Sequence, residues 1–410
     1  MKRKLLTVLA RTGLIVFGIG LSLLLLEIGF RFFYPDPSPK LINQGLQFHP
    51  QYRLAFTPNS EGWNTSLRGE YSAYIKINSK GLRGQEYPYE KDKNTFRILV
   101  LGDSFTAALQ VPEEEIFPKL LETQLQQRYP HTKIEVINAG VVGYGTDNEL
   151  AYFTHEGYKY QPDLVLLALF TGNDLTDNIW NSLYELKDGR LVPSQDVHPV
   201  NLDAPPWGQR EGAFKRARDF LYEHSRLYSV SIEFLTLAAI QKAPVLADLL
   251  VSVGLVELTR PVVNQGNMYA FRYLPPEVWV KTEALIQRLN EEVKAHQGQL
   301  VVTLLPDETD VDPARRAEIQ QAYASLTADK IEPGPPPTLR LAQQLQADQL
   351  LNVELLTPLQ NHREHSNEPL YFKYDGHWTP AGHRVASQAI FDYLITIEEH
   401  LHNFPVEEKP

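Results

Sequence analysis

The chain has 410 residues, which is enough for one large hydrophobic core with insertions. Its composition, 43% hydrophobic and 22% charged, is that of a globular protein and excludes a largely disordered one. The absence of cysteine excludes a disulfide scaffold, a thiolate zinc site and a catalytic cysteine. A net charge of -11 argues against a nucleic-acid partner, because an acidic surface repels the phosphate backbone.

An apolar stretch over residues 12–30 predicts one transmembrane helix near the N-terminus. At about 1.5 Å per residue its length is about 28 Å, close to the thickness of a bilayer core. Basic residues precede it at positions 2, 3, 4 and 11. The positive-inside rule therefore makes residues 1–11 a cytoplasmic tail and places the rest of the chain on the extracytoplasmic, periplasmic side of the inner or plasma membrane.

Two other interpretations of this stretch stay open. A cleavable signal peptide would end in a small-x-small site, but Glu27 and a run of aromatic residues follow the apolar core. A buried soluble helix would not need the flanking positive charge. We favour an uncleaved signal anchor that crosses the membrane once, with Glu27 close enough to the helix end to reach the headgroups.

Residues 31–95 are predicted to form a stalk and an N-terminal extension. A proline-rich segment at 35–39 breaks the helix, and the region after it is polar and rich in turns. A strand is expected at 71–77 and a turn at 78–81. We expect this extension to pack beside the main domain.

Residues 96–398 alternate apolar strands with amphipathic helices, which predicts an α/β fold. A continuous apolar strand is typical of a parallel sheet buried on both faces, with helices on either side. The expected strands are 98–101, 134–137, 164–170, 300–305 and 353–356. The expected helices are 117–129, one after residue 146, 278–293, one ending near 351, and 381–397.

Between residues 175 and 276 the alternation stops, which predicts a helical insertion. Its apolar part, residues 232–258, is interrupted by charged residues and proline, so it is not a second membrane span. It could form a lid over an acyl pocket or pack as ordinary core. Residues 399–410 are expected to be a tail.

Three short segments follow predicted strands: Gly102-Asp103-Ser104-Phe105, Asn138 to Thr146 with its three glycines, and Thr171-Gly172-Asn173-Asp174. The carboxyl ends of parallel strands share one edge of the sheet, so these segments can meet in space. Each alone has an ordinary explanation, as a helix cap, a glycine-rich turn or a Gly-Asn turn. The glycine spacing is not that of a dinucleotide-binding fingerprint.

A fourth segment, Tyr374 to His383, contains Asp375 and His377. A carboxylate next to a histidine can fix its tautomer and stabilise the imidazolium, as in serine hydrolases. A metal site built from Asp375, His377 and His383 would need a further ligand and would explain none of the other segments. We therefore expect no metal and no cofactor.

Together, in this order, these segments resemble the SGNH/GDSL hydrolase family over residues 96–398. The resemblance implies a flavodoxin-like sheet, Ser104 as nucleophile and His377 as general base, oriented by Asp375. It further implies an oxyanion hole made of the Ser104 N–H, the Gly143 N–H and the Asn173 side chain. Gly143 is preferred to Gly140 because the glycine of the family lies five residues after the asparagine of this block, here Asn138.

The chain departs from the family at the histidine, where Asp-x-His-Trp replaces the usual Asp-x-x-His. This spacing is similar to a branch that includes polysaccharide O-acetyltransferases and related envelope proteins. It leaves the geometry of the Asp375–His377 pair to be tested, with His383 as the alternative base.

The resemblance implies a membrane-anchored serine esterase that hydrolyses O-acyl esters of envelope glycans or lipids through an acyl-serine. Three alternatives remain. The same residues would serve an O-acyltransferase on a polysaccharide or, with the apolar stretch 232–258, a lipase. A non-catalytic glycan-binding or assembly protein could retain the fold, although it would be expected to lose some of these residues.

Overall fold

The computed structural model describes residues 2–33, 45–66, 69–181, 183–194, a few positions between 221 and 231, 274–326 and 335–405. The chain divides into two compact units. One comprises Met1–Pro37 and Ala204–Arg260, and the other comprises Ser38–Asp203 and Pro261–Pro410. The second unit contains the sheet.

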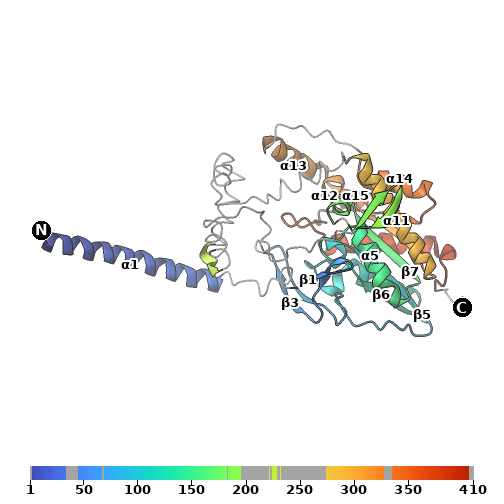
Figure 1. Cartoon of the computed structure of the whole chain (residues 1–410), viewed down its shortest axis with the longest axis horizontal. Coiled ribbons are helices and arrows are strands. Elements are labelled where there is room, and N and C mark those ends of the chain that lie inside the picture. The colour runs from blue at the N-terminus through green and yellow to red at the C-terminus, as the bar shows by residue number, and fades with distance from the viewer. Residues whose placement is uncertain are drawn as a thin grey trace. The chain divides into compact units, whose positions relative to one another are not determined.

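Five parallel strands form the central sheet, in the order β11-β10-β7-β5-β6. Figure 1 labels β5, β6 and β7 of this sheet. Their bounds are β5 Thr95–Gly102, β6 Lys133–Asn138, β7 Leu164–Phe170, β10 Gln299–Leu305 and β11 Asn352–Glu354. Numbered along the chain and taken from the β6 edge, the order is 2-1-3-4-5, which is that of flavodoxin-like folds. The prediction of an α/β fold with a flavodoxin-like parallel sheet is confirmed.

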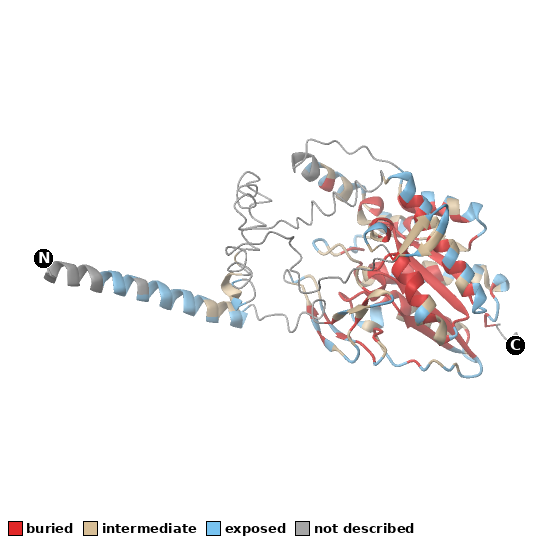
Figure 2. Cartoon of the chain, viewed as in Figure 1, coloured by how far each residue is buried: buried red, intermediate tan, exposed pale blue. Residues whose placement is uncertain are grey.

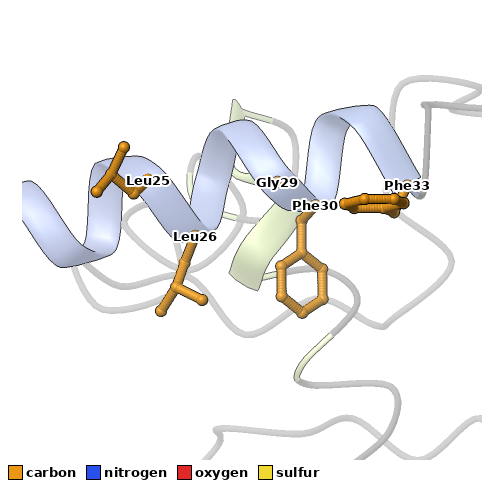
Figure 3. A pocket seen from close by; sticks show the side chains of 5 residues that line it. All are labelled: Leu25, Leu26, Gly29, Phe30 and Phe33. Carbon is orange, nitrogen blue, oxygen red and sulfur yellow. The ribbon is translucent and has the colours of Figure 1, made fainter.

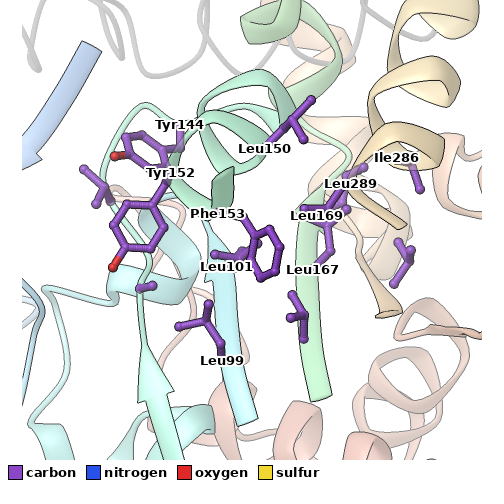
Figure 4. Packing of buried hydrophobic residues seen from close by; sticks show 14 of the residues in the cluster. Leu99, Leu101, Tyr144, Leu150, Tyr152, Phe153, Leu167, Leu169, Ile286 and Leu289 are labelled. Carbon is purple, nitrogen blue, oxygen red and sulfur yellow. The ribbon is translucent and has the colours of Figure 1, made fainter. Parts of the chain in front are cut away.

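Helices cover both faces of the sheet because alternate residues of each strand point to opposite sides. On one face, Leu99, Leu101, Leu167 and Leu169 pack against α5 (Thr146–His155), α11 (Pro276–Ala295) and α14 (Pro337–Ala347), as Figure 4 shows for the first two helices. On the other face, the intervening strand residues pack against α4 (Phe117–Arg128), α15 (Leu356–His365) and α16 (Pro380–Thr396). The buried sheet stands out between these layers in Figure 2.

Shorter elements complete this unit. The helices are α3 Ser104–Ala107, α6 Asp174–Trp180, α12 Glu308–Val311 and α13 Pro313–Leu326. The 3-10 turns are η1 Glu113–Glu115, η2 Gly157–Tyr160 and η4 Glu398–His400. Three antiparallel hairpins pair β1 (Leu46–His49) with β2 (Arg53–Phe56), β3 (Glu61–Thr65) with β4 (Ser72–Lys76), and β8 (Tyr184–Lys187) with β9 (Arg190–Pro193).

The N-terminal extension is part of the main hydrophobic core rather than a neighbour of it. Buried residues of β2, β4 and the following turn lie in the same cluster as Leu99 and Leu101 of β5: Leu54, Phe56, Ala73, Ile75, Ile77 and Leu82. The sequence marks a boundary at residue 96 because the hydropathy pattern changes there. The structure has no separation at that point, since the extension covers the sheet with the α5 and α11 layer.

The segment after residue 174 differs from the helical insertion expected there. It starts as helix α6 and continues as the β8–β9 hairpin, and both elements contact α11. The apolar stretch 232–258 lies outside the described residues. The C-terminal segment is also more than a tail, because Leu401 and Phe404 are buried in the second core cluster, with Phe404 edge-on to Phe96.

Helix α1 (Lys2–Phe33) belongs to the other unit. Its segment Arg11–Phe33 has a mean hydropathy of 2.2 and is long and apolar enough to cross a membrane. Its length, composition and position fit a membrane anchor and a signal sequence alike. Leu25, Leu26, Gly29, Phe30 and Phe33 line a shallow apolar hollow on it, shown in Figure 3, which holds none of the predicted catalytic residues.

Glu27, the one acidic residue of this helix, is paired within its own unit. Its carboxylate accepts a hydrogen bond from the Arg31 side chain at 2.7 Å and from the backbone N–H groups of Arg226 and Leu227, each at 2.9 Å. These contacts satisfy a charge that would otherwise be costly close to an apolar phase.

We predict that Gly140→Ala destabilises the fold by about 3 kcal/mol, the upper end of overpacking costs. A Cβ at Gly140 would lie 2.5 Å from the backbone nitrogen of Ala107 and 2.6 Å from Cβ of Thr106, so the whole helix α3 would have to shift. Denaturant midpoints of the purified variants measure this loss.

Gly189→Ala is the matched control. Gly189 has a φ of +73° but open space around it, so only backbone strain of about 1 kcal/mol is expected. Equal losses in the two variants would contradict close packing as the reason for glycine at position 140.

Candidate active site

The candidate residues meet at the carboxyl edge of the sheet. Ser104 follows β5 and Asn173 follows β7, and these two strands are neighbours. From β5 the chain passes to β6 on one side and then crosses over to β7 on the other side of β5, so this is the point where the strand order reverses. Crevices at such switch points are the usual ligand sites of open α/β sheets.

Ser104 is presented by a tight turn from β5 into the short helix α3. Asp103 caps that helix, with Oδ1 accepting the Phe105 N–H at 2.8 Å and Oδ2 lying 3.3 Å from the Ser104 hydroxyl. Burial raises the pKa of Asp103 to about 6. The segment is therefore a helix cap, as its ordinary explanation predicts. The same turn also leaves the Ser104 side chain partly exposed.

Arg83, a buried residue of the extension, holds the other end of α3. Its guanidinium donates to the carbonyl of Ala107 at 2.7 Å, and also to the carbonyls of Ala108 and Val111. Burial lowers its pKa to about 10, which leaves it charged at neutral pH. A cation is favourable at the carbonyl end of a helix. No local pattern in the sequence distinguishes this arginine from the others, and sequence reasoning missed it.

A hydrogen-bonded line connects Ser104, His377 and Asp375. His377 Nε2 lies 2.8 Å from Ser104 Oγ, and His377 Nδ1 lies 2.7 Å from Asp375 Oδ1. The side chains of His377 and Asp375 are 24% and 20% exposed, so a substrate can approach them. The structure therefore brings together all three residues predicted for the triad, although Ser104 and His377 are 273 positions apart.

The short Asp-x-His spacing allows the Asp375 carboxylate to reach the His377 ring because the chain reverses between the two residues. Gly376 has a φ of +85°, in the left-handed region that favours glycine. The Gly376 N–H donates to the Phe372 carbonyl and the Phe372 N–H donates to the His377 carbonyl, each at 2.8 Å. This turn places the two side chains on the same side.

The electrostatics of the pair favour a charged carboxylate and a basic imidazole. Burial disfavours the imidazolium, but the hydrogen bond and charge of Asp375 outweigh it and raise the pKa of His377 above its ordinary value. Burial would raise the pKa of Asp375, but the hydrogen bonds from His377 and Tyr71 and the charge of His377 lower it.

His383, the alternative base, has a different position. Its ring is buried, and Nδ1 accepts the Phe117 N–H at 3.3 Å at the start of α4. Burial lowers its pKa to about 3, so it is neutral. Within the part of the chain that the structure describes, no three His, Asp or Glu side chains are arranged to hold a metal ion.

The glycine-rich loop after β6 favours Gly143 over Gly140 as a free N–H donor. The Gly140 N–H is already used by Asn138 Oδ1 at 3.0 Å. Gly143 has a φ of +80°, and its carbonyl accepts from the Asn181 amide at 3.3 Å, which fixes the orientation of this peptide.

Asn173 is oriented by a residue that sequence reasoning did not select. Its Nδ2 donates to Asp177 Oδ2 at 2.6 Å, one turn along α6. An amide nitrogen carries two hydrogens, so the second remains available for a ligand. Burial raises the pKa of Asp177 to about 7. Asn173 caps the helix that follows the strand, and Asp177 lies four residues later. This i,i+4 spacing is the sequence signal that could have identified Asp177 as the partner of Asn173.

Two further side chains lie against the triad. The Tyr71 hydroxyl donates to Asp375 Oδ2 at 3.0 Å, and the Gln110 amide lies 3.1 Å from His377 Nδ1. Tyr71 comes from the extension, 304 positions before Asp375. A contact over that distance leaves no local sequence pattern, and neither residue was predicted.

Residues 278–405 match the family model described as SGNH hydrolase-like domain, acetyltransferase AlgX. An arylesterase from Vibrio mimicus is 31% identical over 123 residues, which is 28% of this chain. The chain spans 58% of the length of that curated relative. The resemblance to SGNH hydrolases that the four segments predict is confirmed by the family match, which covers Asp375 and His377 but not Ser104.

Solved structures resemble the chain distantly. A protein of the G-D-S-L family from Desulfitobacterium hafniense is 12% identical with a TM-score of 0.35, covering 73% of this chain and 99% of that one. A catalytic mutant of an acetylxylan esterase from Geobacillus stearothermophilus is 13% identical with a TM-score of 0.36, covering 73% and 94%. Both TM-scores lie below 0.5, so neither likeness says anything about activity or substrate.

We predict that ester hydrolysis by this protein falls on acidification with a midpoint above pH 6.5. A general base must be neutral, and the pKa of His377 is raised by Asp375, so protonation removes activity below that raised value. The pH profile of kcat/KM with nitrophenyl acetate measures the midpoint. A midpoint below 6.5 would contradict the assignment.

Asp375→Asn tests the cause of the shift. Without the carboxylate, burial disfavours the imidazolium and only the charge of Asp103 opposes it, so the pKa of His377 falls and the midpoint moves to lower pH than in the wild type. The plateau also falls, by about 10⁴-fold, because the wrong tautomer is held. His383→Gln is the control: the side-chain oxygen of glutamine can still accept the Phe117 N–H, and the acid limb should stay in place.

Proposed function

We propose that this chain, which carries an SGNH hydrolase-like domain, is a serine esterase that cleaves O-acyl esters through an acyl-serine. The observation that carries the proposal is the continuous hydrogen-bonded line from Ser104 Oγ through His377 to Asp375 Oδ1. Nucleophile, base and orienting carboxylate are in hydrogen-bond reach, which is the arrangement that acyl transfer by serine requires.

In the first step Ser104 Oγ attacks the ester carbonyl while His377 Nε2 takes the hydroxyl proton. Asp375 stabilises the imidazolium that forms and keeps the ring in the required tautomer. The tetrahedral intermediate collapses when the alcohol leaves with the proton from His377, and the acyl group remains on Ser104. In the second step His377 takes a proton from the water that attacks the acyl-serine. His377 then returns the proton to Ser104 Oγ as the bond between Oγ and the acyl carbon breaks, and the acid is released.

The developing oxyanion is assigned to the Ser104 N–H, the Gly143 N–H and the second amide hydrogen of Asn173. Three features support this. Ser104 is the first residue of α3, where the N–H groups have no helical partner. The Gly140 N–H is occupied, and Asp177 holds the Asn173 amide in a fixed orientation. Donors fixed before the reaction cost no reorganisation in the transition state.

For the substrate we propose O-acyl groups of envelope glycans or lipids. The family model that matches residues 278–405 is described as an acetyltransferase domain, which favours a small acyl group. The resemblance of the Asp-x-His-Trp spacing to polysaccharide O-acetyltransferases favours a glycan as its carrier. The acetyltransferase description also favours a second candidate, an O-acyltransferase in which a sugar hydroxyl replaces water as acceptor of the acyl group.

We further propose that α1 is an uncleaved signal anchor that holds the catalytic unit on the periplasmic side of the inner membrane. Its exposed apolar side chains from Leu14 to Phe33 suit a lipid environment, and positive charge precedes them.

We predict that Ser104→Ala lowers hydrolysis of nitrophenyl acetate by about 10³-fold or more, because no other group supplies the nucleophile. Asn173→Ala should lower kcat by about 10²–10³-fold through loss of one oxyanion donor. Initial rates of the full chain in detergent measure both. Ser387→Ala, a buried serine of α16 that donates to Gln124 at 2.7 Å, is the control and should keep its rate.

The outcome decides between the candidates. Wild-type activity equal to that of Ser104→Ala would contradict the serine-esterase proposal. A burst of nitrophenol followed by slow turnover that an added polysaccharide accelerates would favour the acyltransferase over the esterase.

The anchor is tested by sequencing the N-terminus of the mature protein from membranes. We expect an N-terminus before residue 12 and a protein that alkaline carbonate does not extract, because a 23-residue apolar helix remains in the bilayer. A mature N-terminus beyond Phe33 would show a cleaved signal peptide instead.

A further inference from the structure

Residues at the end of the β3–β4 hairpin contact Asp375, on the side of its carboxylate that does not face His377. The hairpin closes through a turn in which the Ser66 N–H donates to the Tyr71 carbonyl at 2.9 Å and the Gly69 N–H donates to the Ser66 carbonyl at 3.0 Å. The next two residues after Gly69 point towards Asp375. The hairpin is anchored independently of the triad, because Asn64 Nδ2 donates to the Leu109 carbonyl at 2.8 Å beside helix α3.

Glu70 and Tyr71 hold Asp375 from two sides. The Glu70 carboxylate accepts the backbone N–H groups of Tyr374 and Asp375 at 3.0 and 3.2 Å, which fixes the main chain. The Tyr71 hydroxyl donates to Asp375 Oδ2 at 3.0 Å, which fixes the side chain. The Tyr71 ring rests on Phe372, with ring centroids 5.2 Å apart.

From this geometry we propose that Tyr71 is a positioning residue of the reaction. Its hydroxyl holds Oδ2 of Asp375, so that Oδ1 of the same carboxylate faces His377. The inference rests on the esterase proposal, because it assigns Asp375 its role there. It makes the extension a component of the active site.

The hydroxyl of Tyr71 is a donor under all working conditions. Burial, followed by the charge of Asp375, raises the pKa of Tyr71 above its ordinary value, so the phenol stays protonated. A carboxylate with one oxygen on His377 and the other on a neutral donor is restrained about its Cβ–Cγ bond. Hydrogen bonds to a charged group are among the stronger ones in proteins.

The Tyr71 hydroxyl also draws part of the negative charge of the Asp375 carboxylate towards Oδ2, away from the oxygen that faces His377. Without Tyr71 more of the negative charge faces the imidazole, which stabilises the imidazolium. The other charged or titratable groups near the pair are Asp103 on the β5–α3 turn, Glu70 on the hairpin and His383 on α16. These three are unchanged in the variants below, so a displaced acid limb reports the hydrogen bond to Asp375.

The test is the pH dependence of covalent labelling of Ser104 by a fluorophosphonate in the full chain. The Ser104 oxygen bonds to phosphorus, fluoride leaves, and His377 takes the hydroxyl proton, so the rate requires a neutral His377 but no natural substrate. We expect Tyr71→Phe, which keeps the ring on Phe372, to slow labelling about ten-fold at the plateau and to move the acid limb to higher pH.

Tyr87→Phe is the matched control. Tyr87 is a buried tyrosine of the same extension whose hydroxyl also donates to a carboxylate, Glu122 at 3.3 Å. We expect its acid limb to coincide with that of the wild type. An acid limb of Tyr71→Phe at the wild-type position, with Tm values of both variants similar, would overturn the inference.

The two proposals fail in different ways. If Ser104→Ala abolishes labelling while Tyr71→Phe retains the wild-type profile, only the role of Tyr71 is lost. If Ser104→Ala is labelled as fast as the wild type, the esterase proposal fails first.

Discussion

The contact between Ser104 Oγ and His377 Nε2 at 2.8 Å is the interaction on which the rest of the site depends. A serine hydroxyl is a weak nucleophile unless a base is within hydrogen-bond reach. Two constraints place the atoms there. The β5–α3 turn fixes the serine at the carboxyl edge of the sheet, and the reversed chain at Gly376 brings the histidine and its carboxylate back over that edge.

Buried polar groups hold this arrangement in place. Arg83 binds the carbonyl end of α3, and Asp177 holds the Asn173 amide. Each of these groups is costly to bury, and each is matched by a specific partner. The carboxyls of Asp103 and Asp177 have pKa values raised by burial, to about 6 and about 7. Shifted pKa values of this kind are common features of functional sites.

The N-terminal extension changes how the catalytic unit should be delimited. Its apolar residues share the core with β5, Arg83 holds the nucleophile helix, and Tyr71 and Glu70 hold the Asp375 segment. A truncated protein that starts at residue 96 would therefore expose part of the core and lose contacts to two of the three triad segments. The unit that carries the candidate triad therefore includes residues of the extension that precede the first strand of the sheet.

The sequence by itself predicted the strands, the main helices and the three side chains that the structure brings together as a candidate triad. These features are local or lie in short motifs: an apolar run such as Leu164–Phe170 predicts a buried strand, and motifs behind parallel strands meet at one edge. Only the tertiary structure decided that the Asp-x-His spacing places both side chains on one side of the turn, and that His383 is buried and bonded to Phe117. It also showed which other side chains lie at the candidate site: Arg83, Tyr71 and Gln110. The reason is physical. Tyr71 and Asp375 are 304 positions apart, and their meeting depends on how the hairpin packs on the sheet, a property of the whole core that no short stretch of sequence carries.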